Sequence, residues 1–350
     1  MVEIKEIKSY DGYGIKAKIS YPDNKDIDKA VIYVNGSGVN TYDNKRRLND
    51  GRTFNYHDLF EKEFLKRDIA YCRYNTRGVE ISDEPPLFSA VNEKEYKTYF
   101  PSNSVKDIES IINYILSVDK FKNAKIYLLG WSEGTIIAPL AALNKKAKVD
   151  GLLLAGYVNE NLKDTMIWQM SGNYEFTFLR YILGYNKKEF ITKDDIEAFT
   201  DKELLGDLKF EDIDINGDGK IDAQDFAPKS LEHLKNMLLA IENNDDEWLK
   251  NNHGVRLTSR WFKEHFKLKP NKEVLPELTV PIYIFHGEMD AMCPKSYAEE
   301  IKEIFLQKEK ENLTVNIFEN HDHDLNFLFY VFKNEISVGL KCIFDTVLKL

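Results

Sequence analysis

Short apolar runs separated by polar loops dominate the first half of the chain. The runs occupy residues 30–34, 69–74, 124–130 and 151–157, and the first three each end in a loop rich in Gly, Asn or Ser. Runs this short and this continuously apolar are typical of parallel strands covered on both faces, although a buried helix can share the pattern. Residues 2–21 instead alternate charged and apolar positions around the pair Asp11-Gly12, which predicts an antiparallel hairpin at the edge of the sheet.

Helical periodicity fills the segments between these runs. In the clearest case Ser104 is the expected N-cap of a helix with one apolar face. That face consists of Val105, Ile108, Ile111, Ile112, Ile115 and Leu116. A second helix is predicted from Gly134 onward. Strands and helices in alternation imply right-handed crossovers, so the predicted fold class is α/β, with a doubly wound and mostly parallel sheet.

This alternation is interrupted once. From 159 to 271 the chain is rich in aromatic and charged residues, and its pattern is mostly helical. The sheet pattern then resumes with a strand at 280–287, a helix near 296–309, a strand at 313–318 and a last helix after 325. We therefore predict an α/β core made of residues 1–158 and 272–350, with a mainly helical cap insertion at 159–271.

The overall composition is that of an ordinary folded protein without a broad basic surface. Of the 350 residues, 43% are apolar and 13% are aromatic, which is enough for a sizeable core. The 48 basic and 58 acidic side chains are interleaved and leave a net charge of -10. Because no large positive surface is available for phosphates, we expect a small-molecule substrate and no nucleic-acid partner.

Cysteine usage and the N-terminal pattern bear on the location of the protein. Cys72, Cys293 and Cys342 are far apart, so they form no complete disulfide framework and have no metal-like spacing. The N-terminus lacks a basic stretch followed by an apolar run, and no apolar run approaches the roughly 20 residues that span a bilayer. We expect a cytoplasmic protein with no membrane span, although a secreted protein whose leader had been removed would show the same pattern.

The first chemical motif is Gly130-Trp131-Ser132-Glu133-Gly134, between a predicted strand and a predicted helix. G-x-S-x-G in this setting is the nucleophile elbow, in which a strained turn exposes the serine and the glycines leave room for neighbouring backbone. We predict that Ser132 is the nucleophile of an acyl-transfer enzyme. The alternative is a glycine-rich turn in which an ordinary serine caps the helix.

A serine hydroxyl needs a base to remove its proton and an acid to orient that base. After a nucleophile elbow these residues follow along the chain in the order acid, then histidine. Asp290, in the loop after the strand at 280–287, is the predicted acid, and Glu160 or Asp164 is the competitor. The base is sought in the loop before the last helix, where His321 and His323 both stand.

Acyl transfer also requires hydrogen-bond donors directed at the developing oxyanion. The backbone N–H of Glu133, which follows the nucleophile, is one expected donor. The loop Asn35-Gly36-Ser37-Gly38 is the expected source of the other, because small residues let the backbone approach a carbonyl oxygen. Within this loop we assign the N–H of Ser37, with a plain tight turn as the alternative.

Together these segments resemble the α/β-hydrolase superfamily, specifically bacterial esterases and the related serine peptidases with an insertion before the acid-bearing strand. The resemblance rests on NGSG, NTRGVEIS, GWSEG, HGEMD and HDHDLN, within residues 30–156 and 279–330. It implies an α/β-hydrolase fold and a Ser-His-Asp triad. It also favours His323 over His321 as general base, because HDLN leads straight into the helix, as the segment after the catalytic histidine usually does in these proteins.

The sequence departs from the family pattern at two positions. Asn35 replaces the His that is common before the first Gly, and Asn75 stands where many relatives have Asp before Arg-Gly. Neither position belongs to the triad, but the first bears on the exact assignment of the oxyanion loop. Arg77, in the same NTRG turn, is expected to be a structural hydrogen-bonding residue.

A second motif lies inside the insertion, at residues 214–225. Its predicted calcium ligands are the side chains of Asp214, Asn216, Asp218, Asp222 and Asp225 and the carbonyl of Lys220. Six oxygen ligands at this spacing, with Gly219 at the sharp turn, suit calcium. The loop resembles that of an EF-hand and, with Asp in the last position, the dockerin variant. Dockerins pair two such loops, so we predict a structural calcium ion rather than cohesin binding; an acidic loop that binds no ion is the alternative.

The sequence therefore predicts a serine hydrolase that cleaves carboxylic esters through an acyl-enzyme, with a structural calcium ion and no organic cofactor. A serine peptidase or amidase with the same triad is the second hypothesis; the absence of the propeller domain that often accompanies such peptidases favours the ester. A non-catalytic, calcium-dependent binding module is the third. Aromatic side chains of the insertion are expected either to line an apolar substrate pocket or to form the insertion's own core.

Overall fold

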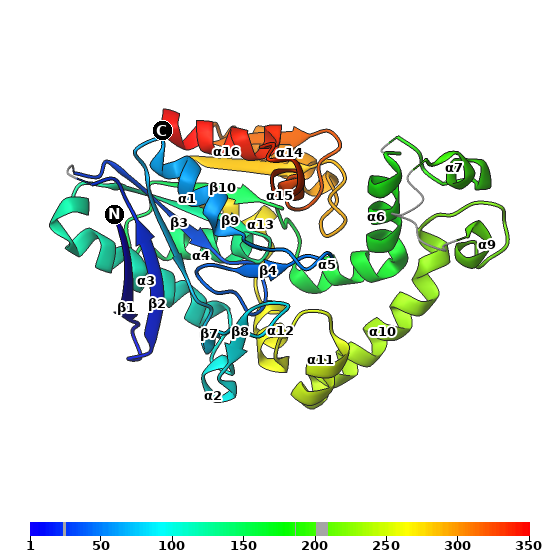
Figure 1. Ribbon diagram of the computed structural model, residues 1–350, viewed down its shortest axis with the longest axis horizontal. Helices are drawn as coiled ribbons and strands as arrows, with labels where there is room; N and C mark the ends of the chain where they lie inside the picture. Colours follow the sequence, from blue (N-terminus) through cyan, green and yellow to red (C-terminus); the bar gives the residue numbers. More distant parts are fainter. Residues whose placement is uncertain (24–25, 186, 201–208) are drawn as a thin grey trace.

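The computed structural model describes residues 1–23, 26–185, 187–200 and 209–350. Its centre is a single eight-stranded sheet (Figure 1). In spatial order its strands are β1 (Val2–Lys8), β2 (Gly14–Ser20), β6 (Ala70–Tyr74), β3 (Lys29–Val34), β9 (Lys125–Trp131), β10 (Gly151–Ala155), β11 (Ile282–Gly287) and β12 (Leu313–Phe318). The pairs β1–β2 and β2–β6 are antiparallel, and every other pair is parallel. The predicted fold class and the edge hairpin are confirmed.

The register of the central strands brings several loops to one edge of the sheet. Val34 of β3 pairs with Gly130 of β9, and Trp131 of β9 pairs with Ala155 of β10. Because these strands are parallel, their carboxyl ends point the same way, and the loops that follow them meet there. This edge is where the predicted nucleophile turn and oxyanion loop lie.

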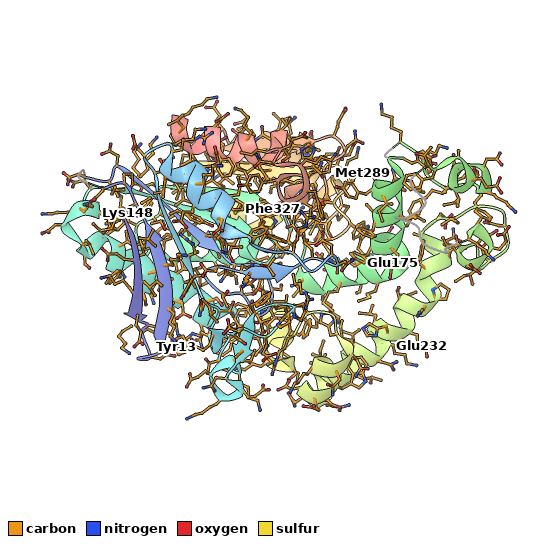
Figure 2. All side chains as sticks on the ribbon, viewed as in Figure 1. Tyr13, Lys148, Glu175, Glu232, Met289 and Phe327 are labelled. Atoms are coloured by element: carbon orange, nitrogen blue, oxygen red, sulfur yellow. The ribbon has the colours of Figure 1, made fainter. Side chains whose placement is uncertain are left out.

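Helices cover both faces of the sheet. On one face, α1 (His57–Leu65), α15 (Phe327–Lys333) and α16 (Val338–Lys349) bury apolar side chains against the strands (Figure 1). Phe327, labelled in Figure 2, stacks on Tyr56 with ring centroids 4.3 Å apart. On the other face lie α3 (Pro101–Ser117), α4 (Gly134–Asn144) and α14 (Ser296–Gln307). The β3, β6 and β10 side chains are buried almost throughout, which is why those strands were continuously apolar in the sequence.

Short elements complete the core. They are β4 (Lys45–Arg47), β5 (Thr53–Asn55), β7 (Val79–Ile81), β8 (Ser89–Val91), α2 (Glu93–Tyr96) and η1 (Asp119–Phe121). The strands β4 and β5 pair with each other, as do β7 and β8, and neither pair joins the central sheet. No helix in the described parts of the chain is both long and apolar enough to cross a membrane.

Two predicted helix boundaries are wrong. Helix α3 begins at Pro101, after Phe100, so Ser104 lies in its first turn and is not its N-cap. Proline lacks the N–H that the first turn would leave unbonded and has a helical φ, which explains the earlier start. The segment after 325 forms two helices rather than one, because Asn334 adopts a left-handed conformation (φ 55°) that ends α15, and Ser337 caps α16.

Between β10 and β11 the described elements are all helical. They are α5 (Leu162–Trp168), η2 (Gln169–Asn173), α6 (Tyr174–Leu183), α7 (Lys193–Ala198), α9 (Phe210–Ile213), α10 (Ala223–Asn243), α11 (Asp246–Asn252), α12 (Ser259–His265), α13 (Asn271–Val274) and η3 (Leu275–Glu277). Figure 1 shows α6, α7 and α9 away from the sheet and α12 beside the core. The long α10 connects the two regions.

The insertion has two apolar clusters. The outer one lies wholly within it and includes Phe176, Ile191 and Ile221. The inner one joins Trp261 and Phe262 to side chains of the α/β core. Several of the aromatic residues noted in the sequence therefore form cores, whereas Tyr174 and Phe178, exposed to 39% and 48%, stack on each other at the surface of α6.

Candidate active site

Ser132 lies in a tight turn between β9 and α4. Its φ is 55°, a left-handed conformation that is strained for a residue with a side chain. A Cβ on Gly130 would lie 2.3 Å from the carbonyl oxygen of Gly134, and one on Gly134 would lie 2.1 Å from that of Val34. The Ser132 N–H donates to the Ala155 carbonyl across 3.0 Å. The two glycines are thus required sterically, and the turn presents a half-buried serine at the carboxyl edge of the sheet.

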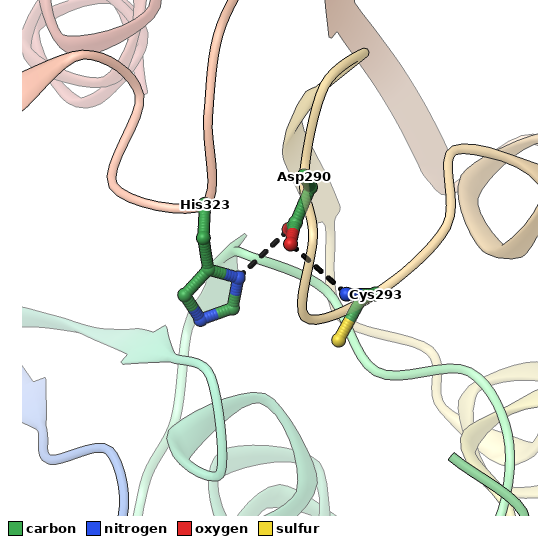
Figure 3. A group of neighbouring side chains, drawn as sticks. All are labelled: Asp290, Cys293 and His323. Atoms are coloured by element: carbon green, nitrogen blue, oxygen red, sulfur yellow. Dashed lines mark hydrogen bonds and ion pairs between the residues drawn. The ribbon is translucent and has the colours of Figure 1, made fainter. Parts of the chain in front are cut away.

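Asp290 and His323 come from two other loops and form a hydrogen-bonded pair (Figure 3). His323 Nδ1 lies 2.8 Å from Asp290 Oδ2. The other carboxylate oxygen, Oδ1, accepts the backbone N–H groups of Met292 and Cys293 at 2.8 and 2.9 Å. Asp290 is fully buried and held from both sides, so it can fix the ring that it contacts.

The ring of His323 is placed next to the serine turn. A Cβ on Gly156 would lie 2.6 Å from His323 Cε1, so the imidazole packs directly on that glycine. Gly156 follows Ala155, whose carbonyl receives the Ser132 N–H. In addition, Trp131 Nε1 donates to the His323 carbonyl at 3.3 Å. Trp131, the residue before Ser132, and Gly156, at the end of the neighbouring strand, therefore hold the histidine loop beside the serine turn.

The charges around this pair shift the pKa values of both groups. Burial disfavours the protonated ring of His323, but the carboxylates of Asp290, Asp324 and Asp322 outweigh that effect and raise its pKa from 6.5 to about 9. Burial likewise favours the neutral acid at Asp290, yet the adjacent imidazolium and its hydrogen bond hold the pKa of that carboxyl below its ordinary value. The pair therefore favours the imidazolium–carboxylate form, the form that a base-catalysed step must produce at the histidine.

A second histidine stabilises the acid loop. His286 at the end of β11 accepts the Tyr157 N–H at Nδ1 and contacts the Cys293 carbonyl through Nε2, at 3.2 and 3.0 Å. Complete burial lowers its pKa, so the ring is neutral, with its proton on Nε2. His286 Nε2 lies 3.8 Å from Asp290 Oδ2 and leaves the shorter contact to His323.

The alternative residues considered from the sequence lie elsewhere. His321 Nδ1 is bonded to the Glu319 carbonyl at 2.7 Å, within its own loop. Glu160 forms an ion pair with Lys272. Asp164 is an exposed side chain in the first turn of α5. None of the three takes part in the contact between Asp290 and His323.

The two expected oxyanion donors border the serine turn. A Cβ on Gly36 would lie 3.4 Å from the Ser132 Cβ and 3.2 Å from the Trp131 carbonyl, so the loop containing Ser37 approaches the turn closely. In the parts of the chain that the structure describes, neither the Ser37 N–H nor the Glu133 N–H donates a hydrogen bond to a backbone carbonyl in a turn, loop or helix cap. Both groups are thus available for an incoming oxygen atom.

The two departures from the family pattern have structural roles. Asn35 donates from Nδ2 to the Tyr74 carbonyl at 3.0 Å and so fixes the loop that contains Ser37. Asn75 donates to the Val79 carbonyl at 2.9 Å and accepts the Tyr42 N–H at 2.8 Å. Each asparagine links neighbouring loops at the carboxyl edge of the sheet.

One cluster among the described residues has the composition of a metal site. Potential ligand atoms of Asp290, Cys293 and His323 all lie within 4.8 Å of one another (Figure 3). Burial raises the pKa of the Cys293 thiol well above its usual range, so the thiolate that a metal requires is disfavoured. Hydrogen bonds already occupy the Asp290 carboxylate and the Nδ1 of the ring. The cluster is better described as an acid–histidine pair beside a buried thiol.

The predicted calcium loop connects α9 to the first turn of α10. Its Asp214, Asn216, Asp218, Lys220 and Asp222 are exposed or half-buried, and Asp225 is buried. Asp214 accepts the Gly219 N–H at 3.0 Å, and Asp225 accepts the N–H groups of Ile215 and Asp222 at 3.0 and 2.9 Å. All candidate ligands are oxygens, and Gly217 and Gly219 have positive φ, as a sharp turn requires. The residue types and the glycine conformations are those of a calcium loop, while the carboxylates of Asp214 and Asp225 accept backbone N–H groups of the loop itself.

Sequence reasoning missed three residues that contact the side chain of Glu133. Tyr99, Trp261 and His265 all donate hydrogen bonds to its carboxylate. They come from segments far from the nucleophile motif and have no motif of their own. No pattern in the sequence could have revealed this contact.

Comparisons with known proteins agree with this architecture. No protein-family model and no curated relative matches the sequence. Among solved structures, a thermostable carboxyl esterase from Bacillus coagulans is 13% identical, with a TM-score of 0.54 over 99% of this chain and 97% of that one. The α/β hydrolase GrgF from Penicillium sp. sh18 is 15% identical, with a TM-score of 0.54 over 100% and 98%. A lipase in its open form is 12% identical, with a TM-score of 0.52 over the whole of both chains. The protein therefore has the α/β-hydrolase fold.

Proposed function

We propose that the protein is a serine hydrolase that cleaves carboxylic esters, with Ser132 as nucleophile, His323 as general base and Asp290 as the acid that orients it. The observation that carries the proposal is the convergence of three loops. A serine in a left-handed turn, a histidine packed on Gly156 and a buried aspartate bonded to that histidine lie at one edge of the sheet. Such a constellation is recognised by its geometry rather than by its position in the sequence.

The reaction proceeds through an acyl-enzyme. Asp290 accepts the Nδ1 hydrogen of His323, which leaves Nε2 free to remove the Ser132 hydroxyl proton as Oγ attacks the ester carbonyl. The N–H groups of Glu133 and Ser37 stabilise the oxyanion. His323 then returns the proton to the leaving alcohol. Water, activated by the same ring, attacks the acyl-enzyme and releases the carboxylic acid.

The choice of ester over amide rests on two arguments. The neighbours reported above include a protein described as a carboxyl esterase and another described as a lipase. An ester has a better leaving group than an amide, so a site needs less assistance to expel it. A serine peptidase or amidase with the same triad is the alternative, and a non-catalytic binding module is a third candidate.

A substrate panel separates these functions. p-Nitrophenyl esters of increasing acyl length and peptide p-nitroanilides would be offered to the wild type and to the variant Ser132→Ala. The proposal predicts ester hydrolysis that the variant lacks. Hydrolysis of the anilides alone would establish the amidase, and inactivity on both substrates, equal to that of the variant, would favour the binding module.

We also propose that loop 214–225 binds one structural calcium ion. The segment that begins at Ile191 lies beside this loop, because Ile191 and Ile221 pair in an antiparallel bridge. The acidic residues of the two segments can therefore be compared. Asp195 follows Ile191 by four residues, just as Asp225 follows Ile221, and Lys188 forms an ion pair with Asp195. An ammonium group thus neutralises the acid in the first segment, and a calcium ion would do so in the second. In this proposal the insertion is a cap, and the ion holds its outer part together.

A further inference from the structure

The residue after the nucleophile has a buried carboxylate. Glu133 is 3% exposed, although it stands in the most reactive loop of the site. Its Oε2 accepts the Tyr99 hydroxyl at 2.5 Å, and its Oε1 accepts Trp261 Nε1 and His265 Nε2 at 3.0 and 2.9 Å. A carboxylate removed from water requires such donors, because an uncompensated buried charge is very costly.

The three donors come from two separate parts of the chain. Tyr99 precedes α3 of the α/β core, whereas Trp261 and His265 lie on α12, within the helical insertion. Each of the three side chains is almost fully buried. The Glu133 carboxylate therefore joins the serine turn to the core and to the inner part of the insertion at the same time.

The histidine in this network has a defined tautomer. His265 Nε2 faces the carboxylate, and its Nδ1 is buried without a partner within the described residues. The proton of a neutral ring therefore resides on Nε2, where it can be donated. A glutamine at position 133 could keep all three contacts only with its NH₂ group towards Tyr99, whose hydroxyl would then have to accept instead of donate. The bonds to the amide would also lose the charge assistance that the carboxylate provides, so the side chain would be held less firmly.

The backbone of Glu133 explains why this anchoring matters. Its N–H belongs to the peptide bond that follows Ser132, whose left-handed conformation (φ 55°) is strained. A strained peptide keeps its orientation only when the surrounding structure over-determines it. The anchored side chain fixes the Cα of Glu133 and hence the direction in which this N–H points.

We propose that Glu133 is a positioning residue: its carboxylate, held by Tyr99, Trp261 and His265, aligns the Glu133 backbone N–H with the oxyanion. This inference rests on the proposed serine-hydrolase function. It assigns the side chain a role in transition-state stabilisation, not in substrate binding.

The test compares Glu133→Gln and Tyr99→Phe with the wild type on a p-nitrophenyl ester. Active sites are counted by titration with a fluorophosphonate, so that kcat refers to competent enzyme only. The control is Glu109→Gln, a buried carboxylate that accepts a hydrogen bond from Asn144 at the far end of α4. A misaligned oxyanion donor should lower kcat by about tenfold to a hundredfold for Glu133→Gln, with KM within about twofold. Tyr99→Phe, which removes one of three bonds, should lower kcat less, and Glu109→Gln should leave it unchanged.

A phosphonate or boronate transition-state analogue provides an independent measurement. Its inhibition constant should rise in parallel with the fall in kcat/KM, which a merely structural role would not produce. If kcat per titrated site for Glu133→Gln stays within about twofold of the wild-type value, the inference is overturned, whatever happens to the melting temperature. Should Glu133→Gln fail to fold, Tyr99→Phe decides alone by the same criterion.

The outcome for the general function is distinguishable. Wild-type ester hydrolysis that is lost in Ser132→Ala establishes the serine hydrolase before the Glu133 variants are compared. Unchanged kcat in those variants then rejects only the positioning role. Wild-type activity no greater than that of Ser132→Ala would reject the proposed function, and the positioning role with it.

Discussion

The imidazole of His323 packs on Gly156 so closely that a Cβ atom there would lie 2.6 Å from the ring carbon Cε1. The glycine terminates β10 next to the strand that carries the serine turn, and its φ is 59°. The end of one strand thus determines where a side chain from another loop can lie.

Replacing Gly156 with alanine should displace the His323 ring from the serine. We expect kcat to fall by about a hundredfold or more, because a general base displaced by about 1 Å loses its alignment. Alanine also strains a left-handed position, so Gly12→Ala serves as the control: Gly12 has φ 84° and nothing within 4 Å of an added Cβ. Equal activities per folded molecule for the two variants would contradict the placement of His323.

The raised pKa of His323 predicts the pH dependence of activity. The base must be neutral to accept a proton, so kcat/KM should increase with pH through the range from 6.5 towards about 9. Asp290, Asp322 and Asp324 face the ring with negative charge, and neutral His286 lies behind the acid. The stabilisation from protonated His323 is complete below pH 6.5 and is lost as the pH rises through about 9, so the melting temperature should fall over the interval in which activity rises.

Two variants separate the contributions to that pKa. Asp290→Asn removes the nearest carboxylate and should lower kcat by about four orders of magnitude, as expected when the ring loses its orienting acid. Asp324→Asn removes a more distant charge, so it should move the acidic limb of the profile slightly towards lower pH while kcat is retained. An acidic limb that stays near 6.5 in the wild type would contradict this account of the charges.

Calcium should stabilise the insertion. With calcium at about 1,000 times its dissociation constant, binding adds about 4 kcal/mol to the stability of the folded state, so the melting temperature of the insertion should exceed that in EDTA by several degrees. Asp218→Ala should abolish this difference in melting temperature. The control is Glu232→Ala, which changes an exposed acidic residue on α10 (Figure 2) and should retain the difference. Identical melting curves with and without calcium, together with no bound metal, would refute the site.

Arg77 should matter for stability rather than chemistry. Its guanidinium is 3% exposed and bonds Asp107 at 2.6 and 2.7 Å and Asp11 at 2.8 Å. Arg77→Met leaves the buried Asp107 carboxylate with the Ser9 hydroxyl but without its cationic partner, so the free energy of unfolding should fall by about 3–5 kcal/mol, with kcat per titrated site unchanged. Arg52→Met, which removes an exposed ion pair, should leave the unfolding midpoint where it is. An Arg77 variant of normal stability would contradict this interpretation.

The fold was predictable wherever local patterns are strong. The buried central strands are continuously apolar, and Gly130 and Gly134 mark the serine turn because each lies against neighbouring backbone. Helix boundaries were less accessible: Ser104 looked like a cap, but Pro101 starts the helix three residues earlier. A helix that starts at Pro101 and one that starts after Ser104 have the same apolar face, so the hydrophobic pattern cannot distinguish the two starting points.

The candidate site was predictable in part for the same reason. Asp290 and His323 could be sought in particular loops because a parallel sheet brings its carboxyl ends together. The partners of Glu133 could not, because Trp261 and His265 reach it from about 130 residues away, as buried contacts of a helical insertion. Such contacts depend on how the insertion packs, and that is a property of the tertiary structure alone.

The most direct test of the central claim is covalent labelling with a fluorophosphonate, followed by mass spectrometry of the digested protein. An activated serine reacts with such a probe, whereas an ordinary surface serine does not. We predict one modified residue, Ser132, with labelling abolished in Ser132→Ala and strongly slowed in His323→Ala. Absence of labelling at Ser132 in the folded wild type, or equal labelling rates in wild type and His323→Ala, would contradict the proposed triad.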